Sequence, residues 1–79
     1  MNPIWTRLKD IIAEKSGMAV DQLTPETNLS TDLGGDDLLV VELSISFAKE
    51  FQIAITDLDV EAIQTLADAE RLILDRVAQ

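Results

Sequence analysis

The spacing of hydrophobic residues predicts helices over most of the chain. In the first segment the apolar residues step by four, three and one, which places them on one helix face: Ile4, Leu8, Ile11 and Ile12. Asn2 before Pro3 is typical of a helix start, and Gly17 is typical of a helix end. The first helix is therefore predicted over residues 3–16.

A second helix is predicted over about 37–51. Its inner row steps by three, four and four: Val40, Leu43, Phe47 and Phe51. Ser44 falls within that row, where a buried hydroxyl needs a partner, so we expect it to bond to the carbonyl of residue 40. The alternative for Ser44 is a polar spot lining a small cavity. A neighbouring row is either buried at a helix contact or exposed as an apolar patch: Leu38, Val41 and Ile45.

Two capping signals predict the remaining helices. "TDLD" at 56–59 resembles a capping box and predicts a short helix over about 57–63, with Val60 and Ile63 facing inward. "TLAD" at 65–68 repeats the signal and opens a last helix to about 77. Its predicted inner face is Leu66, Ala69, Ile73 and Val77. "FQIAI" at 51–55, the one short strand candidate, is interpreted as the end of the second helix and a turn.

The connection over residues 17–36 is long for a compact domain, and such loops are often functional. It carries five large apolar residues, so we expect it to be tied to the core: Met18, Val20, Leu23, Leu29 and Leu33. The sequence as a whole predicts a single all-α domain over 1–79. This domain is a small four-helix bundle with a long loop between the first two helices and a short third helix.

The composition excludes several function classes. The chain has no cysteine and no histidine, which removes a thiol nucleophile and the usual general base, so we expect no enzyme activity. A net charge of −9 disfavours nucleic acid and favours protein partners with basic surfaces, although the same charge also serves solubility. No segment approaches the roughly 18 apolar residues of a membrane span, and no secretory signal is present. We expect a cytoplasmic monomer that binds no membrane.

Three motifs resemble those of acyl carrier proteins. They are "DLGGDDLLVVEL" at 32–43, "EF" at 50–51 and "IQTLADA" at 63–69, within a resemblance that runs from Ile4 to Val77. The resemblance implies a four-helix fold and a shuttle for acyl or aminoacyl chains in fatty acid, polyketide or related metabolism. In this family, the serine after the signature aspartate carries 4′-phosphopantetheine, and the second helix docks onto basic patches of partner enzymes.

The chain departs from the family at that serine, because the position is occupied by Asp37, which has no hydroxyl. We therefore expect 4′-phosphopantetheine to be absent. The cofactor-binding positions implied by the resemblance are Gly34, Asp36, Asp37 and Leu38. The expected partner-binding residues are Leu38, Leu39, Val41, Glu42 and Ile45. For Leu39 the alternative is a single exposed leucine on an ordinary surface.

The pair Asp36 and Asp37 has three interpretations. Carboxylates at a helix start cap free amides and oppose the positive end of the helix dipole, so the pair serves helix initiation. Two carboxylates without a cage make only a weak metal site, and we expect none. The third interpretation is that Asp37 mimics a charged phosphoserine. The other serines (Ser16, Ser30, Ser44 and Ser46) lack the attachment motif.

Two functional hypotheses follow from the resemblance and the missing serine. The first is a carrier-like domain that lost its attachment serine and acts as a regulatory interaction module. The second is a true acyl carrier protein with the serine replaced, by engineering or natural variation, leaving a locked apo form. An enzyme using the carboxylate pair has no base or nucleophile to support it. A shared fold without a shared function is the remaining alternative.

Overall fold

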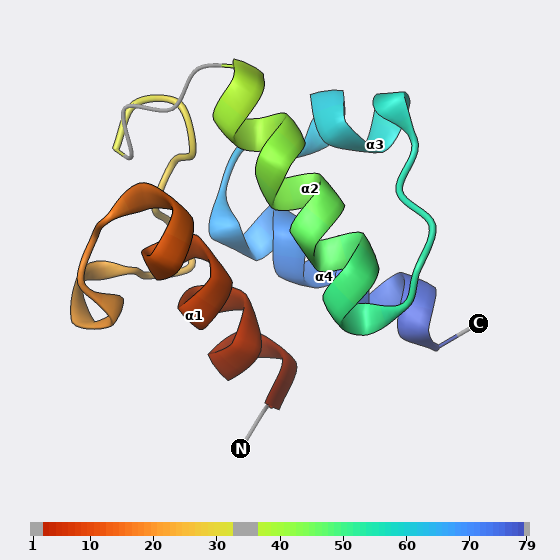
Figure 1. Ribbon diagram of the computed structural model, residues 1–79, viewed down its shortest axis with the longest axis horizontal. Coiled ribbons are helices and arrows are strands. Elements are labelled where there is room, and N and C mark those ends of the chain that lie inside the picture. Colours follow the sequence, from red (N-terminus) through yellow and green to blue (C-terminus); the bar gives the residue numbers. More distant parts are fainter. Residues whose placement is uncertain (1–2, 33–36, 79) are drawn as a thin grey trace.

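The computed structural model describes residues 3–32 and 37–78, which form the helical arrangement shown in Figure 1. The helices in this part of the chain are α1 (Pro3–Ser16), α2 (Asp37–Phe51), α3 (Asp57–Ala62) and α4 (Leu66–Val77). A short 3₁₀ helix, η1 (Val20–Gln22), lies in the connection after α1 and was not expected from the sequence. No helix within the described ranges is long and apolar enough to cross a membrane.

The ends of α1 and α2 are set by residues with positive φ. Gly17 has φ of 81° and its amide donates to the carbonyl of Ala13 across 2.9 Å, which confirms the predicted stop of α1. At the end of α2, Gln52 has φ of 55°, in the left-handed region that non-glycine residues rarely adopt. The stretch that follows is not helical until α3, so "FQIAI" is the end of α2 and a turn, as predicted.

Both predicted capping boxes are present. The Thr56 hydroxyl accepts from the amide of Asp59 across 3.2 Å, and the amide of Thr56 donates to the Asp59 carboxylate across 2.9 Å. Thr65 and Asp68 make the same reciprocal pair at the start of α4. Each box satisfies amides that a helix start leaves without a partner, which explains why α3 and α4 begin where they do.

The core lies among α1, α2 and α4. Its fully buried large side chains are Leu8, Ile12, Leu29, Leu43, Phe47, Leu66 and Ile73. Val40 and Phe51 of the predicted inner row of α2 are only half-buried. The prediction for Val77 is wrong, because this side chain is exposed. As the last residue of α4, Val77 lies at the edge of the core and not inside it.

The loop after α1 is tied to the core as predicted. Leu23 and Leu29 are buried in the core cluster, and Met18 packs against it. The loop also pairs with the start of α4: the amide of Leu29 donates to Gln64, and the amide of Leu66 donates to Thr27. The expected cap at Asn2 and the expected anchor Leu33 lie outside the described residues. The described part of the loop, residues 17–32, is therefore packed onto the rest of the fold.

Candidate functional site

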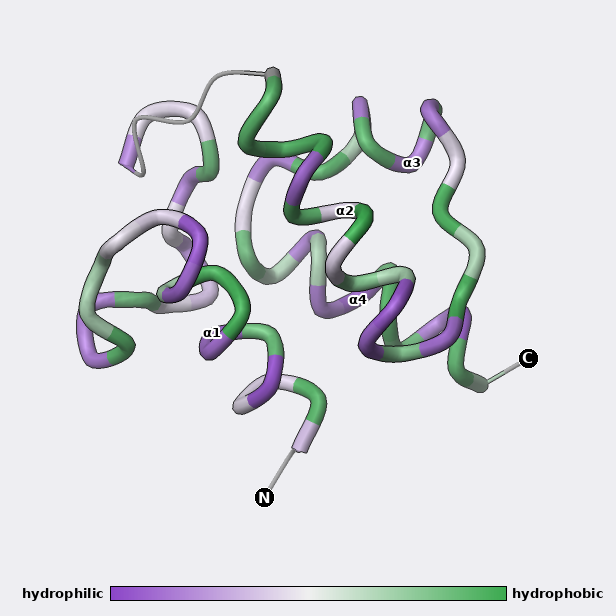
Figure 2. Tube along the Cα trace, in the orientation of Figure 1, coloured by the Kyte–Doolittle hydropathy of each residue, from purple (hydrophilic) through white to green (hydrophobic). Residues whose placement is uncertain are grey.

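An exposed hydrophobic row lies on one face of α2. Leu38, Val41 and Ile45 are 63%, 43% and 51% exposed, at spacings of three and four that keep them on the same side of the helix. Figure 2 shows the hydrophobic character of this helix from its first turn. The sequence left two alternatives for this row, burial at a helix contact or exposure as an apolar patch. The structure shows that the row is exposed. We call these three residues the α2 row.

The remaining predicted partner residues fall on different sides of the helix. Glu42 is exposed and follows Leu38 by one helical turn, so its carboxylate lies beside the α2 row. Leu39 is half-buried and packs against the core. The structure thus brings Glu42 together with the α2 row and sets Leu39 apart from it.

The predicted cofactor positions lie at the start of α2. Asp37 is the first residue of the helix, and its side chain is outside the described part of the structure. Gly34 and Asp36 lie outside the described residues altogether. The start of a helix carries free amides and a partial positive charge, so this is a place where a carboxylate is favoured.

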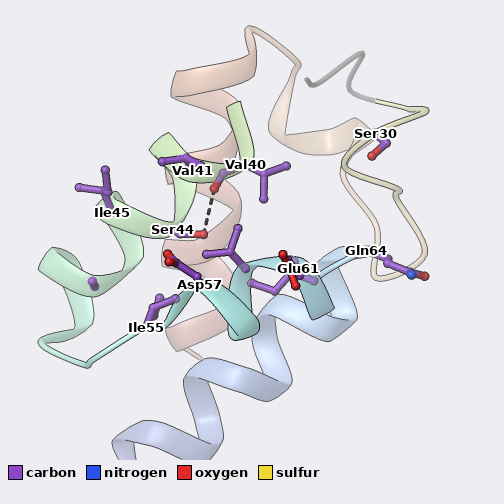
Figure 3. A pocket seen from close by; sticks show the side chains of 12 residues that line it. Ser30, Val40, Val41, Ser44, Ile45, Ile55, Asp57, Glu61 and Gln64 are labelled. Atoms are coloured by element: carbon purple, nitrogen blue, oxygen red, sulfur yellow. Dashed lines mark hydrogen bonds between the residues drawn. The ribbon is translucent and has the colours of Figure 1, made fainter. Parts of the chain in front are cut away.

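A cavity of about 800 Å³ lies between α2 and α3, beside the α2 row. Val41 and Ile45 belong to both the row and the cavity wall, and Val60 of α3 contributes to the opposite wall. Figure 3 shows the labelled side chains of α2 facing those of α3 across this space. The ionisable residues that line the cavity are both acidic, namely Asp57 and Glu61. The site therefore combines an apolar hollow with an acidic edge.

Ser44 supplies a polar group to this cavity. Its hydroxyl donates to the carbonyl oxygen of Val40 across 2.9 Å, drawn as a dashed line in Figure 3, and the residue is buried. The predicted bond back to residue 40 is confirmed, and the alternative, a polar spot on a cavity wall, holds as well. The hydroxyl is already satisfied within α2, so the cavity wall contains no unmet donor at this point.

An ion pair fixes the other side of α3. The guanidinium of Arg76, in the last turn of α4, donates to both carboxylate oxygens of Asp59, across 2.8 and 2.9 Å. Hydrogen bonds from Arg76, and then from the backbone amide of Thr56, lower the pKa of Asp59 to about 2. Sequence analysis missed this pair. The two residues are 17 positions apart on different helices, and neither the periodicity nor a motif joins them.

The described residues offer no cluster for metal binding. No group of three or more Asp, Glu, His or Cys side chains converges within residues 3–32 and 37–78. The buried side-chain polar atoms in the same part of the chain all have hydrogen-bond partners. What the site presents is an exposed apolar row, an acidic edge and a cavity, which are features of a binding surface.

Comparisons with known proteins agree with this geometry. Residues 6–73 match the family model PP-binding, described as a phosphopantetheine attachment site. The acyl carrier protein of Enterococcus faecalis is 29% identical, with a TM-score of 0.80 over 92% of each chain. The acyl carrier protein of Thermotoga maritima, at 23% identity, has the same TM-score over 92% of this chain and 85% of that chain. These likenesses confirm the predicted all-α bundle with a long first loop and a short third helix.

A third solved structure is that of a doublet acyl carrier protein. The apo doublet acyl carrier protein from prodigiosin biosynthesis is 30% identical, with a TM-score of 0.80 over 92% of this chain. Only 35% of the doublet chain is covered, so the present chain spans about a third of its length.

Proposed function

The chain belongs to the acyl carrier protein family, and on this premise we propose that it docks onto partner enzymes through α2 without carrying phosphopantetheine at position 37. Acyl carrier proteins are non-catalytic carriers, and this chain is not an enzyme. The proposal concerns what this member of the family does with a carrier fold when its attachment position is an aspartate.

The sequence around position 37 supports the loss of priming. The motif "DLGGDDLLVVEL" runs without a gap through the position at which the family has its serine, and Asp37 occupies that position. The family linkage is a phosphodiester to a side-chain hydroxyl, and a carboxylate cannot form it. The residue present therefore does not fit the cofactor, and no transfer step through a phosphopantetheine arm is assigned to this chain.

The α2 row is the observation that carries the docking role. Exposed large apolar side chains in a row are costly in water and mark interaction surfaces when they lie together. Glu42 beside the row, with Asp57 and Glu61 at the cavity, gives this side of the molecule an acidic character. A net charge of −9 steers a basic surface toward it and raises the rate of encounter. The proposed partners are enzymes of acyl or aminoacyl metabolism with basic docking patches.

The second candidate function is that of an ordinary acyl carrier protein locked in its apo form by one residue. It differs from the first in what restoring serine would do. In a locked carrier, the recognition surface for priming enzymes is intact, and a single substitution restores the attachment. In a diverged interaction module, that surface has changed as well, and the substitution restores nothing.

Priming in vitro tests the proposal. The chain, an Asp37→Ser variant and an Asp36→Ser control are incubated with coenzyme A and a promiscuous phosphopantetheinyl transferase, and the intact masses are measured. We expect no increase in mass for the chain itself. We also expect none for the control, which introduces a serine one position away from residue 37. A phosphopantetheine on the unsubstituted chain contradicts the proposal. A gain by Asp37→Ser alone identifies a locked carrier, and no gain by any of the three favours the interaction module.

A further inference from the structure

A second hollow lies between α1 and α2. Its volume is about 360 Å³, and its lining residues come from both helices: Ile11, Glu14, Lys15, Ser46, Lys49 and Glu50. No described residue lines both this hollow and the cavity beside α3. In Figure 1, α2 lies between α1 and α3, so the hollow and the cavity flank α2 on different sides. We call the second one the α1–α2 hollow.

The α1–α2 hollow is locally positive, although the chain as a whole is strongly acidic. One of its two glutamates is neutralised, because the carboxylate of Glu50 is met by Nη2 of Arg7 across 2.7 Å and by Nε across 3.3 Å. Lys15 and Lys49 then face the single remaining carboxylate, that of Glu14. Three of the six basic residues of the chain are thus gathered around this hollow.

The donors of the hollow have no partner among the described residues. Neither Lys15 nor Lys49 is in an ion pair within 3–32 and 37–78, and the hydroxyl of Ser46 makes no hydrogen bond there. Each lysine lies in the last turn of its helix, where the dipole favours a positive charge. The dipole accounts for each lysine alone, but not for the presence of both in one hollow beside an unpaired hydroxyl. Ammonium and hydroxyl groups donate hydrogen bonds, so the hollow offers donors to an anion.

The side chains around these donors favour one carboxylate over a more highly charged anion. Glu14 keeps a negative charge on the wall of the hollow, which disfavours a group that carries two charges, such as phosphate. An aspartate or glutamate side chain has one charge and two acceptor oxygens, so it can accept from both lysines. Ile11 lines the same hollow and offers an apolar contact to the methylene groups of such a side chain. The hollow therefore suits an acidic side chain.

The net charge of −9 does not prevent such a contact at physiological ionic strength. The Debye length is about 8 Å at 0.15 M salt, whereas the molecule measures 31 × 29 × 19 Å. Charges on the far side of the molecule are therefore screened at the hollow. The acidic edge of the cavity, at Asp57 and Glu61, lies on the other side of α2. The charges that border the hollow decide what binds there.

The solvent face of α2 carries a negative charge and a positive charge two turns apart. Glu42 and Lys49 are seven positions apart, which places them on the same side of the helix and about 10 Å apart along its axis. Both side chains are exposed, and Ser46 lies between them at spacings of four and three. A partner that lies along α2 therefore meets Glu42 at one end of its contact and Lys49 at the other.

We propose that the α1–α2 hollow receives an aspartate or glutamate side chain of the protein partner that docks on α2. The inference rests on the proposed docking function and adds to it a contact of opposite sign. The partner surface then has a basic patch opposite Glu42 and an acidic residue opposite Lys49, about 10 Å away along the helix. A partner whose surface is basic throughout meets unpaired lysines at the hollow, so the two charges select among partners.

Peptides of defined charge test the hollow by NMR. Acetyl-tetraglutamate amide is titrated into the isotope-labelled chain at an ionic strength of about 0.15 M, and the backbone amide shifts are recorded. We expect progressive shifts at Lys15, Ser46 and Lys49. Tetraglutamine with the same blocked ends should leave these amides unchanged. Blocked tetralysine should instead shift amides on the acidic side of α2, near Glu42 and Asp57.

Charge-removing variants identify the groups that bind the peptide. Lys49→Gln and Lys15→Gln should each reduce the glutamate-induced shift of the Ser46 amide at least twofold at a fixed peptide concentration. Lys9→Gln is the matched control, because it makes the same charge change on α1. The ammonium of Lys9 lies 5.5 Å from the centre of the Trp5 ring, and this lysine does not line the hollow.

The outcomes separate this inference from the docking function on which it rests. The absence of a glutamate-induced shift at the hollow overturns the inference. An equal reduction in Lys49→Gln and Lys9→Gln also overturns it, since the peptide would then respond to net charge and not to the hollow. The tetralysine peptide reports on the acidic docking face separately. Its failure to shift that face would count against the docking function, whereas its success together with an unresponsive hollow would contradict the inference alone.

Discussion

The hydroxyl of Ser44 donates to the carbonyl oxygen of Val40, one turn earlier in α2, and so a polar residue is satisfied within the inner row of a hydrophobic helix. The bond is local and needs no partner from another element. The carbonyl of Val40 can also accept the backbone hydrogen bond of the helix, so the bond from Ser44 adds little to stability. The serine does place an oxygen on the wall of a cavity.

Ser44→Ala should therefore leave stability unchanged or raise it by up to about 1 kcal/mol, since alanine favours helix more than serine does. The measurement is the free energy of unfolding from urea titration. Ser46→Ala on the same helix is the control for the change in helix propensity alone, because Ser46 is only half-buried. A loss of stability of several kcal/mol in Ser44→Ala, absent in the control, would show that the hydroxyl has a structural role beyond its bond to Val40.

Core truncation should be far more costly than truncation on α3. Leu43→Ala removes a buried side chain and is expected to destabilise the fold by about 2–5 kcal/mol, because a cavity is left in a close-packed core. Leu58→Ala removes a side chain of the same size that is exposed, and should change the free energy of unfolding by less than about 1 kcal/mol. Similar losses in the two variants would contradict the assignment of Leu58 to the surface.

The acidic composition predicts a stability that depends on salt. At net charge −9 the folded chain repels itself, and added salt screens that repulsion, so the melting temperature should rise from low to high ionic strength. Lys49→Glu replaces a positive charge by a negative one at an exposed position, which makes the net charge more negative by two, and it should make the rise steeper. If the melting temperature of both proteins is the same at low and high ionic strength, self-repulsion does not contribute significantly to their stability.

The lowered pKa of Asp59 predicts a specific loss of folding stability in acid. Its pKa falls from 3.8 to about 2 on folding, mainly through the bonds from Arg76, so the folded state favours the ionised form. The stabilisation is complete above pH 4, where the unfolded chain is also ionised, and it is lost as pH falls from about 4 to 2. The advantage of the unsubstituted chain over Asp59→Asn in urea titrations should therefore shrink across that window. An advantage that stays constant down to pH 2 would contradict the lowered pKa.

The docking face can be tested with a priming enzyme as the partner. If Asp37→Ser is a substrate of a phosphopantetheinyl transferase, adding Glu42→Lys should lower kcat/KM several-fold, because the charge beside the α2 row is reversed. Glu14→Lys makes the same change at an exposed position on α1 and serves as the control. Equal rates for the Glu42 and Glu14 variants would remove Glu42 from the docking face.

The local features of the fold could be predicted from sequence because their causes are local. The stop at Gly17 and the capping boxes at Thr56 and Thr65 each depend on residues within one helical turn. The bond from Ser44 to Val40 belongs to the same class. Such features are readable because the backbone groups that need partners are next to the side chains that supply them.

The features that sequence analysis missed are those made by tertiary packing. The pairing of Arg76 with Asp59 joins two helices, and the depth and volume of the cavity follow from where α3 rests against α2. Helix periodicity gave the α2 row and left open whether it was buried or exposed. It also could not separate Leu39, which packs on the core, from its exposed neighbour Leu38. Only the arrangement of the other helices decides those outcomes.

The central claim, that this member of the acyl carrier protein family works without a phosphopantetheine arm, is tested most directly by its intact mass after purification from the cells that make it. The account predicts the mass of the unmodified chain. A mass increased by one phosphopantetheine group, mapped by fragmentation to any residue of the chain, would contradict it.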